Sequence, residues 1–79
     1  FRSMASNWSQ VYVNLARNAA KNDLKEAYKY LDTALQYDSN YLPAHIAYAE
    51  NLVEEGKYND AEVRLKAAKK IDSEYAPIY

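Results

Sequence analysis

The side chains that most often perform chemistry are scarce in this 79-residue chain. It has one histidine, His45, and no cysteine, so no Ser/His/Asp or Cys/His catalytic set can be assembled. The adjacent acids Glu54 and Glu55 would point to different sides of a helix, because helical neighbours are three or four residues apart. Metal ligands would need histidines or acids gathered on one face, and no convincing group is present. We therefore expect no enzyme activity, no catalytic residue, no metal and no cofactor, and we assign His45 to packing between helices.

Composition and charge narrow the classes of partner. The chain is 49% hydrophobic and 27% charged, with a net charge of −1, which is the balance of a soluble globular domain. A near-neutral net charge argues against nucleic-acid binding, for which a basic face is the usual feature. No apolar run approaches the roughly 20 residues that span a membrane. We expect neither nucleic-acid binding nor membrane insertion. The absence of cysteine is consistent with a reducing compartment, and the cytoplasm is the default expectation.

Repeated helices are the elements that would position a binding surface. One glycine and two prolines leave little material for strand hairpins, whereas alanine, leucine, lysine and glutamate are plentiful. Apolar residues recur every three or four positions, which predicts amphipathic helices near residues 8–21, 24–37, 42–55 and 58–71. When the second half of the sequence is laid on the first, in what we call the repeat alignment, identical residues pair: Ala27 with Ala61, Leu31 with Leu65, Ala34 with Ala68, Asp38 with Asp72, Ser39 with Ser73, Tyr41 with Tyr75 and Pro43 with Pro77.

Residues that favour helix starts precede these segments. Asp23, followed three residues later by Glu26, predicts an N-cap with a capping box for the second helix. Asn7 and Asn40 are expected to cap the first and third helices. Pro43 is tolerated in the first turn of the third helix, where backbone amides lack partners anyway.

The only glycine, Gly56, falls between the third and fourth helices. Helices commonly end in a residue with positive φ, which glycine adopts without steric cost, so Gly56 predicts a tight turn between antiparallel helices. In the first repeat we expect Asn22 to take the same conformation.

This helix–turn–helix pattern, which recurs after about 34 residues, resembles the tetratricopeptide repeat family. Besides Tyr48-Ala49, Leu52 and Leu15-Ala16, the resemblance is carried by a set of structural repeat positions: Ala27, Leu31, Ala34, Gly56, Tyr58, Ala61, Leu65 and Ala68. His45 departs from the family pattern, which prefers tryptophan there. The first helix aligns with the third when Leu15-Ala16 is laid on Tyr48-Ala49. Leu15 and Tyr48 are separated by one residue fewer than the pairs of the repeat alignment, such as Ala27 and Ala61. The register of the first helix therefore differs by one residue from that alignment.

The resemblance implies an all-α fold in which two tandem helix–turn–helix repeats form a short right-handed α-solenoid. We set residues 1–4 apart as an expression remnant and take 5–79 as the domain. Repeat 1 then spans about 8–41 and repeat 2 about 42–75, with a third repeat or a cap starting at 76–79.

In this family the first helix of each repeat lines a groove that binds a peptide or a partner helix. Carried over to this chain, the groove residues are Gln10, Val13, Asn14, Arg17, Ile46, Ala47, Glu50, Val53 and Glu54. Arg17 contributes positive charge, whereas Glu50 and Glu54 contribute negative charge. Such a surface fits an extended or helical segment with apolar anchors and at least one basic residue.

The resemblance thus implies a protein-binding scaffold or adaptor without chemistry of its own. One alternative is a structural building block that self-associates, as a homodimer or by helix exchange, or stacks within a longer array. This alternative rests on the apolar stripe of the last helix, which includes Leu65 and Ile71. Without a second copy or a further repeat packed against it, that stripe would be exposed to solvent. A regulatory domain of a larger protein is a further alternative. The sequence names no partner.

Overall fold

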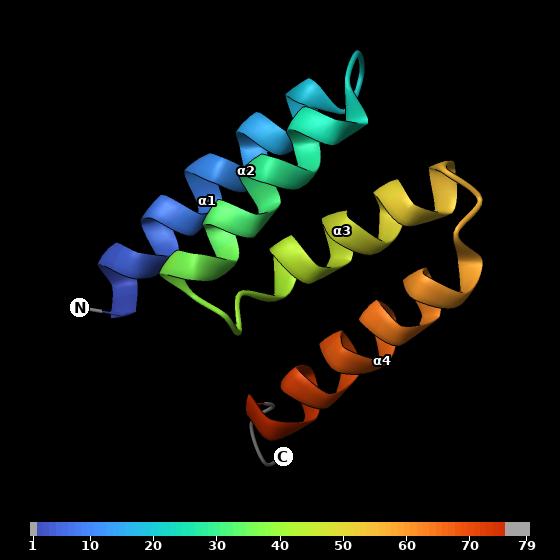
Figure 1. Cartoon of the computed structure of the whole chain (residues 1–79). Helices are drawn as coiled ribbons and strands as arrows, with labels where there is room; N and C mark the ends of the chain where they lie inside the picture. The colour runs from blue at the N-terminus through green and yellow to red at the C-terminus, as the bar shows by residue number, and fades with distance from the viewer. Residues whose placement is uncertain (1, 76–79) are drawn as a thin grey trace.

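The computed structural model describes the backbone of residues 2–75 and the side chains of residues 7–72. Within these residues the chain forms four helices and no strand (Figure 1). In chain order the helices are α1 (Arg2–Ala19), α2 (Leu24–Tyr37), α3 (Leu42–Glu54) and α4 (Tyr58–Tyr75). The expected all-α, helical-repeat architecture is confirmed.

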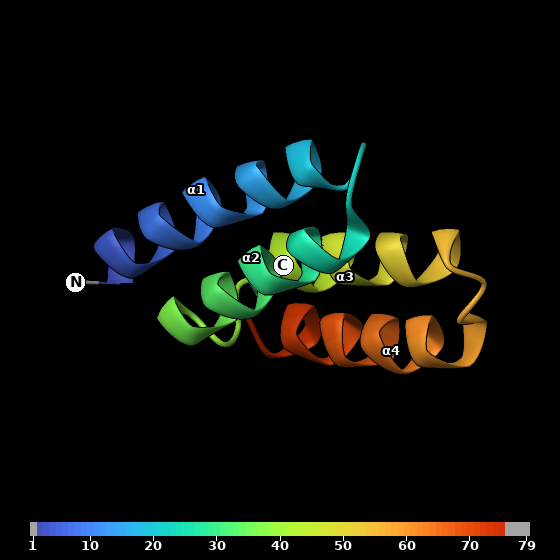
Figure 2. The ribbon, with the colours of Figure 1, turned by 45° about the horizontal axis from the view of Figure 1, so that its top comes forward.

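The four helices form two antiparallel hairpins joined through α3. Helix α1 packs along α2, and α3 packs along α4. Both α1 and α2 also contact α3, whereas α4 contacts only α3 among the described helices. Figure 2 shows the resulting order, with α2 and α3 lying between α1 and α4. Helix α3 therefore couples the two hairpins.

Small side chains allow the helices to approach closely. The main core contains Val13 and Leu31, and its other buried members are alanines: Ala16, Ala27, Ala34, Ala44 and Ala47. Alanine at a helix crossing lets the backbones come together, while the larger side chains fill the remaining space. The buried Ser9 hydroxyl donates a hydrogen bond to the Ala34 carbonyl over 2.7 Å and ties α1 to α2. A second, smaller core between α3 and α4 consists of Ala49, Leu52 and Ala61.

The turn between α3 and α4 has the expected geometry. Gly56 adopts a φ of 78°, and its amide donates to the Val53 carbonyl over 2.9 Å. The Lys57 amide donates to the Leu52 carbonyl over 2.8 Å. Together these bonds form a Schellman motif, which satisfies carbonyls that the end of a helix leaves free.

The turn between α1 and α2 is built differently. The expected positive φ at Asn22 is wrong, because no described residue other than glycine has a positive φ. Instead, the amides of Asn22 and Asp23 both donate to the Ala19 carbonyl, over 3.0 and 2.7 Å. These two bonds close the turn without a residue entering the left-handed region.

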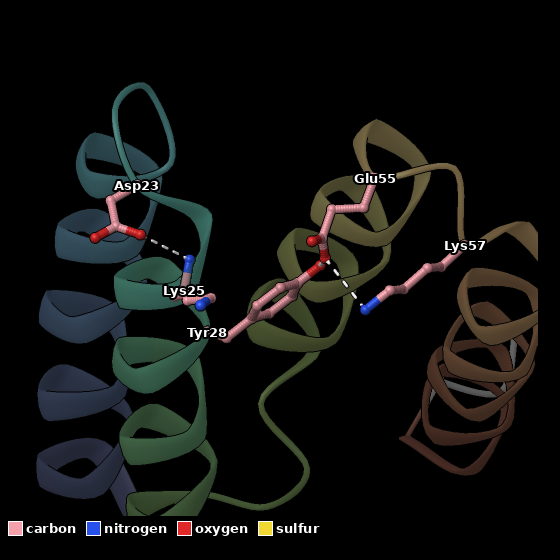
Figure 3. Close-up of polar contacts among 5 residues, drawn as sticks. All are labelled: Asp23, Lys25, Tyr28, Glu55 and Lys57. Carbon is pink, nitrogen blue, oxygen red and sulfur yellow. Dashed lines mark hydrogen bonds and ion pairs between the residues drawn. The ribbon is translucent and has the colours of Figure 1, made fainter.

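Of the expected N-caps, only Asp23 acts as one. Its side chain accepts a hydrogen bond from the backbone amide of Lys25 (Figure 3). It also accepts one from the backbone amide of Glu26. The cap of α3 is Tyr41, which makes no side-chain cap bond, so the expected Asn40 cap is wrong. The backbone amide of Asn40 donates a hydrogen bond to the side-chain carboxylate of Asp38. Pro43 lies in the first turn of α3, as expected.

The outer two helices are longer than expected. Helix α1 begins at Arg2 rather than at residue 8, so Asn7 lies inside it and the expected cap there is wrong. No proline or glycine stands between Arg2 and Asn7, and nothing in that stretch stops the helix. Helix α4 continues to Tyr75, a full turn beyond the expected end at residue 71. Residues 76–79, where a third repeat or cap was expected, lie outside the described residues.

Candidate functional site

A groove cavity of about 430 Å³ lies between α1 and α3. Its lining residues are Arg17, Ala20, Lys21, Ala47, Glu50, Asn51 and Glu54. Helix α1 and the turn after it thus contribute two basic residues, and α3 contributes two acidic residues. Arg17 and Lys21 form one wall of the cavity. Glu50 and Glu54 form the other, because residues four apart share one face of helix α3.

The cavity brings together four of the nine residues that the sequence predicts for the groove, namely Arg17, Ala47, Glu50 and Glu54. Gln10 and Asn14 are exposed on α1 but do not line the cavity. Ile46 and Val53 are exposed on α3 and also lie outside it. Val13 is buried in the main core. It supports the groove from beneath and offers no surface to a ligand.

The two walls are bridged by a single weak ion pair. The Arg17 guanidinium lies 3.5 Å from the Glu50 carboxylate, and both side chains are at least half exposed. Exposed pairs of this kind contribute about 0–1 kcal/mol, so an incoming charged group can replace either partner at little cost. Within the described part of the chain, Lys21 and Glu54 form no ion pair.

Asn51 is one of three lining residues that the sequence did not predict, the others being Ala20 and Lys21. It is only 8% exposed, yet it lines the cavity. Among the described residues its side-chain amide has no hydrogen-bond partner. Because no buried side-chain polar atom is left unsatisfied, the polar atoms of this amide keep some contact with solvent where the residue lines the cavity. An asparagine amide offers both donor and acceptor, which matches the main chain of a peptide. Asn51 could have been predicted from the sequence, because it lies one helical turn after Ala47, which was itself a predicted groove residue.

Lys21 was detectable by the same rule, because it follows Arg17 by one turn within a helical pattern. Ala20, also missed, carries no chemical signal. Its contribution is its small size, which keeps the cavity open beside α3.

His45 is buried at a second polar cluster and has a packing role. Its Nε2 lies 2.9 Å from the Ser39 carbonyl, and its Nδ1 lies 3.3 Å from the Arg64 guanidinium. A carbonyl can only accept and a guanidinium can only donate, so the ring is the neutral tautomer with the proton on Nε2. The same guanidinium lies 4.2 Å from the centroid of the Tyr48 ring, a cation–π contact. His45 thereby links α3, α4 and the loop before α3.

Tyr28 joins the two hairpins on another side of α3. Its hydroxyl donates to the Glu55 carboxylate over 2.6 Å, and Lys57 lies 3.7 Å from the same carboxylate (Figure 3). Burial raises the pKa of the Tyr28 phenol well above its ordinary value, and the neighbouring Glu55 raises it further. Burial and Asp32 likewise raise the pKa of Tyr48. Both phenols therefore stay protonated near neutral pH and serve as hydrogen-bond donors and packing groups.

Within the described residues, no group of three or more histidine, cysteine or acidic side chains is placed to hold a metal ion. None of the described helices is both long and apolar enough to cross a membrane. The groove between α1 and α3 is thus the strongest candidate for a functional site in this part of the chain.

Comparison with known protein families agrees with the geometry. The family model described as tetratricopeptide repeat matches residues 18–79, which is most of the chain. Repeats of this family typically mediate protein–protein interaction and are not catalytic. No curated protein and no solved structure matches the chain significantly. Because the family match covers well over half of the sequence, the chain belongs to the tetratricopeptide repeat family.

Proposed function

We propose that this chain is a protein-interaction module that binds an extended peptide in the groove between α1 and α3. The observation that carries the proposal is the cavity of about 430 Å³, which has a basic wall, an acidic wall and an unpartnered Asn51 amide. A protein or peptide partner is the class to which the family points.

Asn51 favours an extended peptide over a partner helix. The interior of a helix has already used its own amides and carbonyls, so it has few main-chain groups to offer. An extended peptide presents unpaired amides and carbonyls along its length, and the side-chain amide of Asn51 can pair with one of each. Binding would then satisfy a nearly buried polar group that the free protein leaves without a protein partner.

The walls specify the charge of the bound segment. A basic peptide side chain fits beside Glu50 and Glu54, and an acidic one fits beside Arg17 and Lys21. Between them, Ala20 and Ala47 leave room for a small apolar side chain. We therefore expect a peptide in which a basic and an acidic residue flank a small apolar residue.

A peptide-display selection against the immobilised chain tests this proposal. We expect the selected peptides to share a basic residue, and Glu50→Arg to weaken them by about tenfold or more, because like charges would then face each other. Glu62→Arg is the matched control, since Glu62 is an exposed glutamate in an ion pair with Lys66 on α4, outside the groove. Binders that tolerate Glu50→Arg as well as they tolerate Glu62→Arg would contradict the proposed site.

A second measurement separates an extended ligand from a helical one. Methylating each main-chain nitrogen of a selected peptide in turn should reveal one position at which affinity falls for the native chain. Methylation at that same position should weaken binding to the Asn51→Leu variant little further. This variant already lacks the side-chain amide with which the N–H of the peptide would pair. A helical ligand would instead show sensitivity at side chains spaced by three or four residues.

A further inference from the structure

Two exposed apolar faces lie on α1 and on the α3–α4 hairpin, apart from the groove. The first, which we call the α1 face, consists of Trp8, Val11 and Leu15. The second, which we call the α3–α4 face, consists of Ile46, Tyr58 and Leu65. Neither set lines the groove cavity.

The internal repeat explains what the α3–α4 face lacks. Leu31 and Leu65 are equivalent in the repeat alignment, yet Leu31 is 0% exposed and Leu65 is 48% exposed. Val13 and Ile46 are equivalent when α1 is laid on α3, and they are 3% and 37% exposed. The first repeat is therefore covered at positions where the second repeat is open.

Helix α3 provides the cover for the first repeat. Val13 and Leu31 share their core with the α3 residues Ala44 and Ala47, and Tyr41 and Tyr48 pack at its edge. The missing cover of the α3–α4 face would thus be a helix that offers the equivalents of these residues.

The α1 face offers the equivalents of three of these four residues, and the fourth, Ala47, corresponds to Asn14. In the same alignment of α1 with α3, the residues Trp8, Val11 and Leu15 correspond to Tyr41, Ala44 and Tyr48. These three α1 residues are 51%, 45% and 40% exposed, so they are free to cover another molecule. One chain therefore carries both halves of the contact that joins its own two hairpins.

The charge pattern of α1 supports a buried role for this face. From Asn7 to Ala16 the helix contains no charged residue, although more than half of these positions are exposed. The cores of protein interfaces are depleted in charge and enriched in aromatic residues. Trp8 is also held in place by the Tyr37 ring, whose centroid lies 6.1 Å from its own.

We propose that copies of this chain associate head to tail, with the α1 face of one copy covering the α3–α4 face of the next. The contact joins two different surfaces, so association continues beyond a dimer unless the copies close into a ring. It also leaves the groove cavity free, and the inference is therefore independent of the proposed peptide binding.

Sedimentation of single-face variants and their mixture tests the proposal. The native chain should show a mass that rises with concentration above that of the 9.1 kDa monomer. Leu15→Glu blocks the α1 face and Leu65→Glu blocks the α3–α4 face, so each variant alone should associate at least about tenfold more weakly. Mixed together, the two variants should form a one-to-one dimer, because each retains the face that the other lacks.

Controls and contrary outcomes follow from the same geometry. Val63→Glu adds the same charge to α4 at an exposed residue that lines a different pocket, with Tyr48 and Arg64, and should associate like the native chain. Tyr58→Lys, on the same face as Leu65, provides a second variant, and circular dichroism checks that each variant is helical. Monomers at every concentration would overturn the proposal. So would dimerisation of one single-face variant alone as strong as the association of the native chain, which indicates a symmetric contact, or unchanged association of both variants, which indicates helix exchange.

Discussion

Leu31 and Leu65 occupy equivalent places in the two repeats but differ in exposure, and this difference sets their contributions to stability. Leu31 is fully buried in the main core, whereas Leu65 is 48% exposed. We predict that Leu31→Ala lowers the free energy of unfolding by about 2–5 kcal/mol, because it leaves a cavity, and that Leu65→Ala lowers it by less than about 1 kcal/mol. Urea unfolding at low micromolar concentration, where association is weakest, measures both. Similar losses would contradict the burial assigned to these two positions.

Tyr28 gives the chain an alkaline limit to its stability. Its pKa in the folded chain is raised above the ordinary value of 10.0 by burial and by Glu55. The folded state therefore keeps the phenolic proton where the unfolded state releases it. This contribution to stability is complete below pH 10 and is lost as the pH rises further.

Tyr28→Phe should flatten this decline. We predict a loss of about 1 kcal/mol near pH 8, from the missing hydrogen bond to Glu55, and a smaller further loss between pH 8 and pH 11 than in the native chain. Tyr48, whose pKa is also raised, remains in both proteins, so the decline in Tyr28→Phe is flattened and not abolished. Thermal unfolding at the two pH values is the measurement, and parallel declines in the two proteins would contradict the assignment.

At the residue scale, the sequence predicted charged groove residues better than it predicted their neighbours. Arg17, Glu50 and Glu54 stand out because their charges fall on the family's binding helices. Asn51 was missed because a polar residue in a helix gives no sign, from sequence alone, that it is nearly buried and unpartnered. That property depends on how closely α1 approaches α3, which only tertiary packing decides.

The two turns place different demands on their residues at the scale of the elements. Gly56 has a φ of 78°, and a Cβ added there would meet no atom within 4 Å. The cost of Gly56→Ala is therefore backbone strain alone, and we predict a loss of about 1–2 kcal/mol. Asn22→Gly is the matched control. No described residue other than glycine has a positive φ, so Asn22 is not in the conformation that glycine relieves. The substitution Asn22→Gly should therefore not stabilise the first turn. Thermal melts compare the two, and stabilisation by Asn22→Gly would indicate strain at Asn22.

Element boundaries were predictable where one local interaction dominates. The glycine turn and the Asp23 cap each depend on a conformation or bond that the residue itself provides. The caps assigned to Asn7 and Asn40 were wrong for different reasons. Helix α1 continues through Asn7, while α3 begins one residue too late for Asn40 to hold the N-cap position, which Tyr41 takes. A residue that can cap a helix does so only when the neighbouring backbone reaches it.

At the scale of the whole molecule, α3 is the element on which cooperativity depends. Both helices of the first hairpin contact α3, whereas α4 reaches the rest of the described structure only through α3. Ala44 is fully buried where α3 meets the first hairpin. In a repeat protein, stability is approximately the sum of the stability of each repeat and of the interfaces between them. Weakening the α3 interface should therefore uncouple the hairpins before it unfolds either one.

Ala44→Leu tests this coupling, with Ala67→Leu as its control on the half-exposed rim of an outer pocket. Overpacking at Ala44 should cost about 1–3 kcal/mol, whereas the control should cost less than about 1 kcal/mol. The single tryptophan, Trp8, stacks on Tyr37 and reports on the first hairpin, while circular dichroism reports on all helices. We predict that the two signals unfold together in urea for the native chain and the control, and that they separate in Ala44→Leu. Coincident transitions in Ala44→Leu would mean that the hairpins remain coupled through contacts other than Ala44, such as the bond from Tyr28 to Glu55.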